Sequence, residues 1–339
     1  MSIAESYDAM HAAINNATRL FLSLMWVPFI FSIFPSIAQS GITARYLYKL
    51  SDFSGTIPYS QVRVSVDSQH NEVYVDDGGS VRIFNESGME IYSFLETQEL
   101  GGIYGIVVDE DGDIYLLSYD YPPSDYPSAE GIAKRRFYLC RCNYRGKLIE
   151  KITLSNLPPE YSEYGPNCMY YRNGRFFFAN LRGMTAIVTD KRGVFEKGFN
   201  FGAIIGVDEN ERPDTEFFGF YVDREENFYF TVPVNFKAYK VSPEGKVFSF
   251  GKPGGAPGMF GVVSGIAVNN DGNIFVTDKL KCVVMVFNRN FKFLTEFGFR
   301  GSAPGNLIAP ASVALGNNGQ VYVTQSPKAG VSVFSVTAN

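Results

Sequence analysis

The stretch AVNNDGNIFVT, residues 267–277, joins an apolar run, a polar turn and a second apolar run centred on an aromatic residue. The same pattern recurs at residues 64–75, 107–117, 170–179, 221–231 and 314–324, which makes six copies along the chain. The aromatic residues at equivalent points of the six copies are Tyr74, Tyr115, Phe177, Tyr229, Phe275 and Tyr322. Because a repeat of roughly 40–60 residues sets a whole architecture, this pattern is the main signal in the sequence.

Each copy is followed by a loop, a third apolar run, a turn and a fourth run. The third runs are residues 81–84, 137–142, 185–188, 238–241, 283–287 and 331–334. Apolar alternation broken by turn residues at this spacing predicts four antiparallel strands in each unit. One such sheet cannot bury both of its faces, whereas six sheets arranged radially can. The sequence therefore predicts an all-β fold, a six-bladed β-propeller.

The two ends of the repeat region predict how the ring closes. The sixth unit stops after its third strand, and a spare run, ITARYLYKL at residues 42–50, precedes the first unit. We expect this N-terminal strand to pair with the C-terminal three and complete the last blade, because that would remove two exposed sheet edges. The propeller then spans residues 41–339, and residues 1–40 form a separate leader.

Two segments between units carry a family resemblance. GKPGGAPGMFGVVSGIAV at residues 251–268 and GFRGSAPGNLIAPASVAL at residues 298–315 each lead into a turn that contains two asparagines. In these segments the chain resembles the NHL-repeat propellers, over about residues 42–339, with units one and three matching least. The resemblance implies the six-bladed fold. It selects no function, because NHL propellers include scaffolds, RNA binders and, more distantly, enzymes.

The leader contains LFLSLMWVPFIFSIF at residues 20–34, which follows Arg19 and precedes the small residues Ser36, Ala38 and Ser40. This order is typical of a cleaved export signal. We expect the mature protein to start between Gln39 and Gly41 and to be periplasmic, secreted or on the cell surface. A membrane anchor over residues 20–38 and a buried helix are alternatives, although the run is shorter than the ~20 residues that a spanning helix prefers.

The axis of the ring is where propeller enzymes usually carry their active sites. Alignment of the units places six residues there: Arg63, Gly105, Asn167, Gly219, Gly265 and Ser312. None is a carboxylate, whereas a calcium-dependent lactonase-type propeller needs a cluster of acidic and amide oxygens. The two histidines are His11 in the leader and His70 in a turn. We therefore expect no catalytic residue, no metal and no cofactor, and interpret Arg63 and Asn167 as a polar pair bridged by channel water.

Two further groups of residues are expected to be structural. DEDGDIY at residues 109–115 lacks the distal bidentate Glu of a calcium loop and is interpreted as a hairpin turn. Cys140 and Cys142 lie on one face of a predicted strand with Cα atoms about 6.6 Å apart, at the edge of disulfide geometry. Cys168 and Cys282 belong to other units, and a metal site built from the four thiols has little support.

The loops on one face of the ring are the candidate binding surface. The loop of unit two, residues 118–136, contains Tyr121 and Tyr126 among prolines, which would supply contact area at low entropic cost, unless it is a disordered insertion. The equivalent loops carry basic residues, namely Arg182, Lys237, Lys279, Lys281 and Lys328. We expect these side chains to be exposed and to form a positive rim, with scattered solubilising cations as the alternative.

The formal net charge of −5 at pH 7 does not indicate a dedicated nucleic-acid binder. We predict a non-enzymatic, exported propeller that serves as a protein-binding or scaffold module. Its partner would be another protein or an anionic macromolecule on the loop face, and membrane contact would occur only through an uncleaved leader. A hydrolase or lyase with a channel active site is one alternative. An RNA-binding NHL propeller, which requires that the leader is not an export signal, is the other.

Overall fold

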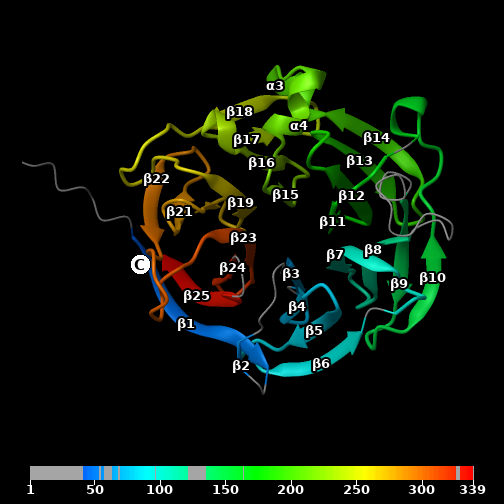
Figure 1. Ribbon diagram of the computed structural model, residues 1–339, viewed down its shortest axis with the longest axis horizontal. Helices are drawn as coiled ribbons and strands as arrows, with labels where there is room; N and C mark the ends of the chain where they lie inside the picture. The colour runs from blue at the N-terminus through cyan, green and yellow to red at the C-terminus, as the bar shows by residue number, and fades with distance from the viewer. Residues whose placement is uncertain are drawn as a thin grey trace, which may run out of the picture. The chain divides into compact units, whose positions relative to one another are not determined.

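The computed structural model describes residues 41–52, 55–56, 63–67, 69–95, 97–120, 135–162, 164–325 and 329–338. Ser40–Asn339 form one compact unit, in which six sheets surround a common axis (Figure 1). The predicted six-bladed β-propeller is therefore confirmed. The expected leader, residues 1–40, lies outside the described residues, and its interpretation stays a prediction. No helix in the described part of the chain is long and apolar enough to cross a membrane.

The first three blades follow the chain in order, each with its innermost strand first. Blade 1 comprises β3 (Arg63–Asp67), β4 (Glu72–Asp76), β5 (Ser80–Phe84) and β6 (Glu90–Leu95). Blade 2 comprises β7 (Gly102–Val108), β8 (Ile114–Asp120), β9 (Arg136–Cys142) and β10 (Leu148–Ile152). Blade 3 comprises β11 (Cys168–Arg172), β12 (Arg175–Asn180), β13 (Thr185–Asp190) and β14 (Phe195–Asn200), preceded by the short helix η1 (Pro159–Tyr161).

The remaining blades continue the pattern. Blade 4 comprises β15 (Phe220–Val222), β16 (Phe228–Val232), β17 (Lys237–Val241) and β18 (Val247–Phe250), with η3 (Pro233–Asn235) between its middle strands. Blade 5 comprises β19 (Val263–Val268), β20 (Ile274–Asp278), β21 (Val283–Phe287) and β22 (Phe293–Phe297). Blade 6 comprises β23 (Pro310–Leu315), β24 (Gln320–Gln325), β25 (Val331–Ala338) and β1 (Ile42–Asp52), with β2 (Gly55–Thr56) at its edge.

The ring closes through β1, as the sequence predicts. β1 runs antiparallel to β25 from Ile42 opposite Ala338 to Leu50 opposite Val331, with a bulge between Tyr46 and Tyr48. Leu50 is fully buried, and the rings of Tyr46 and Phe334 meet edge to face at 5.7 Å. The last blade is therefore built from both ends of the propeller, and neither end leaves an unpaired inner strand edge.

The repeated aromatic residues form the core between blades. All six are at most 3 % exposed, because each lies on the second strand of its blade, which has a neighbouring strand on either side. Tyr115 packs on Phe176 of the next blade at 4.9 Å, and Phe177 packs on Phe228 at 5.8 Å. Burial of such a side chain contributes ~1.5–3 kcal/mol, and aromatic pairs add ~0.5–1.5 kcal/mol. The repeat therefore stabilises the contacts between neighbouring blades.

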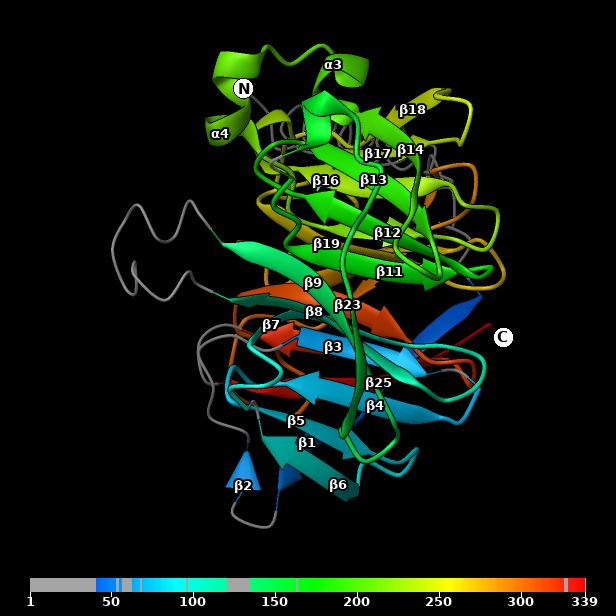
Figure 2. The same cartoon turned by 90° about the vertical axis from the view of Figure 1, so that its right-hand side faces the viewer.

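A helical insertion between blades 3 and 4 was not predicted. It contains α3 (Phe201–Ile205), η2 (Glu209–Glu211) and α4 (Arg212–Thr215). The Asn200 side chain caps α3 by accepting a hydrogen bond from the Ala203 amide at 3.0 Å, and Gly206 ends it with a φ of 79°. In Figure 2, α4 and the start of β9 project to the same side of the ring. We call this side, which carries the connections between blades, the loop face.

Candidate functional site

A cavity of about 1100 Å³ occupies the axis of the ring. All six residues that the sequence alignment assigns to the axis line this cavity: Arg63, Gly105, Asn167, Gly219, Gly265 and Ser312. Arg63 begins β3, Asn167 and Gly219 immediately precede β11 and β15, and Gly105, Gly265 and Ser312 lie within β7, β19 and β23. All six therefore lie on the channel wall, as expected.

Part of the channel wall is made of closely packed backbone. A Cβ atom added at Gly265 would lie 2.5 Å from the Ser312 Cα atom, and one added at Gly219 would lie 2.5 Å from the Ser264 carbonyl oxygen. Glycine is needed at both positions because the inner strands of blades 4, 5 and 6 approach one another too closely for a side chain. At these two positions the channel wall is therefore backbone.

Arg63 and Asn167 each have protein partners of their own. The Arg63 Nη1 atom donates to Asp76 Oδ2 at 2.6 Å and to the Ile103 carbonyl at 3.0 Å. The Asn167 Oδ1 atom accepts from the Leu181 amide at 3.0 Å. These contacts hold the two side chains at the mouth of the channel without a bridge between them, and the water-bridged pair stays a prediction.

Aromatic rings and a second guanidinium surround Arg63. The Arg63 guanidinium lies 5.4 Å from the centre of the Tyr104 ring, and Arg135 lies 5.7 Å from the same ring and donates to its hydroxyl. Tyr104 also packs on Tyr119 at 4.6 Å. Cation–π contacts of this kind stabilise a guanidinium where water is partly excluded. Blades 1 and 2 therefore give this side of the mouth a positive, aromatic wall.

The inner strand of blade 3 lines the channel with side chains that the sequence analysis missed. Along β11 the half-buried residues Cys168, Tyr170 and Arg172 alternate with more deeply buried ones, and all three line the cavity. The Arg172 guanidinium lies 5.8 Å from the centre of the Tyr170 ring and 5.7 Å from that of Tyr221. Strand periodicity predicts such a row of side chains, because residues two apart along a strand share a face. The sequence analysis considered one residue of each inner strand and did not extend to the residues further along β11.

Among the described residues, the carboxylates that line the cavity lie at its far end, in the turns between inner and second strands. These are Asp223, Glu225 and Asp271, and the cations Arg224, Lys240 and Arg289 line the same end. Among the described residues, no group of three or more His, Cys, Asp or Glu side chains could hold a metal ion. His70 also lies in such a turn, as predicted, with Nδ1 2.5 Å from Asp67 Oδ2, and this contact raises the pKa of His70.

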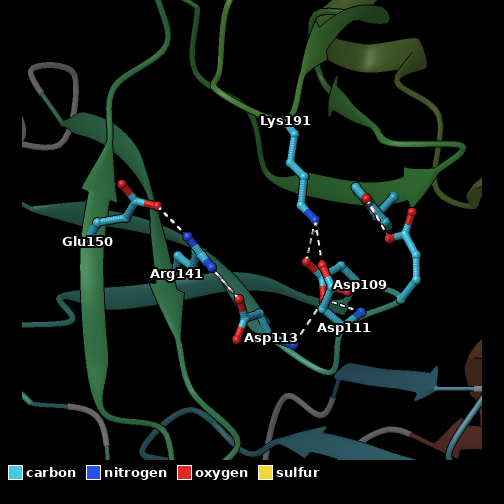
Figure 3. A network of polar contacts seen from close by, with 8 residues as sticks. Asp109, Asp111, Asp113, Arg141, Glu150 and Lys191 are labelled. Atoms are coloured by element: carbon cyan, nitrogen blue, oxygen red, sulfur yellow. Dashed lines mark hydrogen bonds and ion pairs between the residues drawn. The ribbon is translucent and has the colours of Figure 1, made fainter.

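The acidic stretch 109–115 forms the predicted hairpin turn. Asp109 Oδ1 accepts the amides of Asp111 and Asp113 at 3.0 Å and 2.9 Å, and Gly112 adopts a φ of 82°. Figure 3 shows the carboxylates directed at cations of the protein itself. The Lys191 Nζ atom lies 2.8 Å from Asp109 Oδ2, and Arg141 lies 2.7 Å from Asp113. The Lys191 ion pair therefore joins blades 2 and 3, and the Arg141 ion pair lies within blade 2.

The cysteines lie where structural thiols are expected. Cys140 and Cys142 are fully buried in the core between blades, and the four thiols at positions 140, 142, 168 and 282 are free. Burial raises the pKa of Cys168, the one that lines the channel, to about 12. Because the thiolate is the nucleophilic form, this raised pKa disfavours reaction of Cys168 at neutral pH.

The predicted exposure of the basic rim is only partly correct. Arg182 is exposed. Lys237 is half-buried and donates to the Gly251 carbonyl at 3.0 Å, and Lys279 is half-buried with its Nζ atom 4.9 Å from the centre of the Phe218 ring. Burial lowers the pKa of Lys279. Lys328, Tyr121 and Tyr126 lie outside the described residues.

The prediction that Lys281 is an exposed rim residue is wrong. Its side chain is only 12 % exposed and forms an ion pair with Glu296 at 3.0 Å. Its Nζ atom also donates to the carbonyls of Ala256 and Met259 at 3.0 Å and 3.2 Å. A long lysine stem can fold back onto nearby carbonyl oxygens, and here it fastens the loop between blades 4 and 5.

The loop face of blades 4 to 6 instead presents exposed apolar side chains. We call this set the apolar patch: Phe218, Val234, Phe236, Met259, Val262, Leu280, Phe299 and Ile308, which are 37–62 % exposed. Hydrogen bonds connect its loops, since the Lys279 amide donates to the Val262 carbonyl at 2.8 Å and Arg300 donates to the Leu280 carbonyl at 2.7 Å. Phe218 also lines the cavity, so the apolar patch adjoins the channel mouth.

Known structures resemble the ring at low sequence identity. A catalytically inactive virginiamycin B lyase from Staphylococcus aureus matches with a TM-score of 0.51 and 12% identity, over 82% of this chain and 80% of that chain. An auxiliary nutrient binding protein from Bacteroides ovatus matches with a TM-score of 0.56 and 13% identity, over 87% and 76%. A putative gluconolactonase matches with a TM-score of 0.54 and 12% identity, over 88% and 93%.

These proteins share the six-bladed fold. At such identities the likeness shows the fold alone. The names of the matched proteins describe both enzymes and a binding protein. No protein-family model and no curated protein matches the sequence. The narrower resemblance to NHL-repeat propellers therefore stays a prediction.

Proposed function

We propose that this propeller is an exported, non-enzymatic module that binds another protein through its loop face. The apolar patch is the observation that carries the proposal. Soluble monomers rarely expose large contiguous apolar surfaces, and such a surface rimmed by polar groups is typical of an interaction site. The eight side chains come from five connections, from the one that enters blade 4 to the one that joins blades 5 and 6, yet all five lie on the loop face.

The chemistry around the patch defines the partner. Lys279 and Arg300 contact the patch through the Phe218 ring and the Leu280 carbonyl, and Arg182 is exposed on the same face. A complementary partner would bury apolar side chains against Leu280 and Phe299 and place carboxylates at the margin. Binding energy would come mainly from the apolar centre, whereas the rim charges would act on the association rate.

The channel supports the non-enzymatic part of the proposal. Three of its six axis residues are glycines, and at Gly219 and Gly265 an added Cβ would clash with neighbouring backbone. The thiol of Cys168 is held protonated by burial, and the Arg63 guanidinium is already bonded to Asp76. A hydrolase or lyase would need an activated base or nucleophile at this level, whereas the hydroxyl of Ser312 there is paired with that of Thr324 at 2.8 Å.

Site-specific photo-crosslinking in the native cells tests the loop face. A photoreactive amino acid at Leu280 should capture one specific protein, whereas the same group at Ile91 should not. Ile91 is a matched control because it is an apolar side chain on the outer strand β6 that is 48 % exposed. The captured protein, identified by mass spectrometry and purified, is then titrated with the propeller.

For that purified partner, L280D and F299D together should weaken binding at least about tenfold, because central apolar contacts of an interface contribute over ~1 kcal/mol each. The I91D control should bind as the unmodified protein does. Equal affinity of the double variant and the unmodified protein would overturn the loop-face proposal.

Export is tested on the protein isolated from its own cells. N-terminal sequencing should find a start between Gln39 and Gly41, outside the cytosol. A protein retaining residues 20–34 in the membrane fraction would support the anchor instead. A full-length protein in the cytosol would refute export and revive the RNA-binding alternative.

A further inference from the structure

We propose that the channel is a separate binding site for a small aromatic carboxylate, which Arg172 holds by its guanidinium. This site lies at the axis of the ring and does not depend on the apolar patch. Its basis is the arrangement of Cys168, Tyr170 and Arg172 along β11, beside blade 4 and the glycine arc formed by Gly219 and Gly265.

The charge of the channel wall selects an anion. Arg63 and Arg172 are the charged residues that the described inner strands contribute to the lining of the cavity. Arg63 is offset by the buried carboxylate of Asp76, 2.6 Å away. Within the described part of the chain, Arg172 has no carboxylate partner: its Nε atom donates to the Val222 carbonyl at 3.2 Å and its Nη1 atom to the Tyr171 carbonyl at 2.8 Å, and its guanidinium lies against the two tyrosine rings named above.

The carbonyl contacts orient the Arg172 guanidinium and leave its Nη2 atom without a partner among the described residues. A guanidinium in a partly desolvated cavity is stabilised by an anion, and its planar edge matches a carboxylate. The carboxylates that line the cavity, Asp223, Glu225 and Asp271, belong to turns at the end where β11 reaches Arg172, and no ion pair joins them to Arg172 among the described residues. A ligand carboxylate would therefore supply the charged partner that Arg172 lacks there.

The rings beside Arg172 select an aromatic ligand. Tyr170 and Tyr221 meet edge to face with centres 5.4 Å apart, and the Tyr221 hydroxyl donates to the Val268 carbonyl at 2.8 Å. The Tyr170 hydroxyl has no hydrogen-bond partner among the described residues, and burial raises its pKa far above neutrality, so it stays a donor. A cavity of about 1100 Å³ accommodates a ring system of drug-like size.

Isothermal titration of the mature protein with 2-naphthoate tests the proposal. We expect one saturable site per chain, and no binding of 2-naphthamide, which has the same rings without the charge. R172Q should weaken binding about tenfold or more, because a hydrogen bond to a charged group contributes ~1.5–3 kcal/mol. R192Q, which alters an 84 % exposed arginine in an outer turn, should bind normally.

A second variant keeps the test independent of folding. Y170F removes a hydroxyl that makes no hydrogen bond in the described structure, so the melting temperature should not change while 2-naphthoate binds about threefold or more weakly. Unchanged affinity in both R172Q and Y170F would overturn the channel site. If L280D loses 2-naphthoate binding while R172Q keeps it in full, the ligand binds on the apolar patch. That result would equally overturn the channel site.

Discussion

Deletion of residues 42–50 should leave the protein insoluble or lower its melting temperature severely. The deleted run is most of β1, which pairs along β25 and completes blade 6. Without it, the edge of β25 is unpaired, and an exposed strand edge promotes aggregation. The deletion also removes the fully buried Leu50 and the contact of Tyr46 with Phe334.

A point variant measures the same closure without removing the strand. L50A should lower the free energy of unfolding by ~2–5 kcal/mol, as removal of a buried leucine side chain does, in urea titrations monitored by circular dichroism. R45A is the matched control, since Arg45 lies on the same strand with an exposed side chain and should change stability by less than ~0.5 kcal/mol. A deletion variant that melts as the intact protein does would contradict closure by β1.

G265A should destabilise the ring although it adds only one methyl group. The new Cβ would lie 2.5 Å from the Ser312 Cα atom and 2.9 Å from the Val313 amide nitrogen. Both neighbours are backbone, so no side chain can rotate away, and blades 5 and 6 would have to separate. Overpacking of this kind costs ~1–3 kcal/mol. We expect the free energy of unfolding of G265A, measured by thermal or urea unfolding, to fall by an amount near the upper end of this range.

G255A provides the comparison for this substitution. Gly255 lies in the connection between blades 4 and 5, and an added Cβ would meet no atom within 4 Å. It should leave stability unchanged or raise it slightly, because alanine restricts the unfolded chain. If G265A and G255A unfold at the same urea concentration, the inner strands of blades 5 and 6 do not pack as closely as described.

The fold could be predicted because every blade repeats the same requirement for a buried side chain on its second strand. A second strand with neighbours on both sides needs a large buried side chain at its centre, and Tyr74, Phe177 and Phe275 provide it. The helical insertion breaks this regularity. Its signals, the capping Asn200 and the terminating Gly206, are local, and a five-residue helix has no apolar periodicity long enough to be recognised.

The candidate sites were less predictable because they depend on distances that the sequence does not contain. The axis level follows from aligning the units, but Tyr170 and Arg172 lie further along β11, where the six units no longer carry equivalent residues. Lys281 was misassigned because a loop position does not reveal whether a flexible side chain extends into water or folds back onto carbonyls. Leu280 and Phe299 share one face because the loop between β20 and β21 and the connection that follows β22 lie on the same side of blade 5.

The pairing of β1 with β25 also has a consequence for the order of events during synthesis. Ile42 lies opposite Ala338, so the first strand of the propeller leaves the ribosome long before its partner exists. Contacts of such high sequence separation form slowly, and early segments stay exposed until the last blade is complete. Final assembly must therefore wait until β25 has left the ribosome, and a chain kept unfolded until then could still pass through a narrow translocation pore before it becomes a ring.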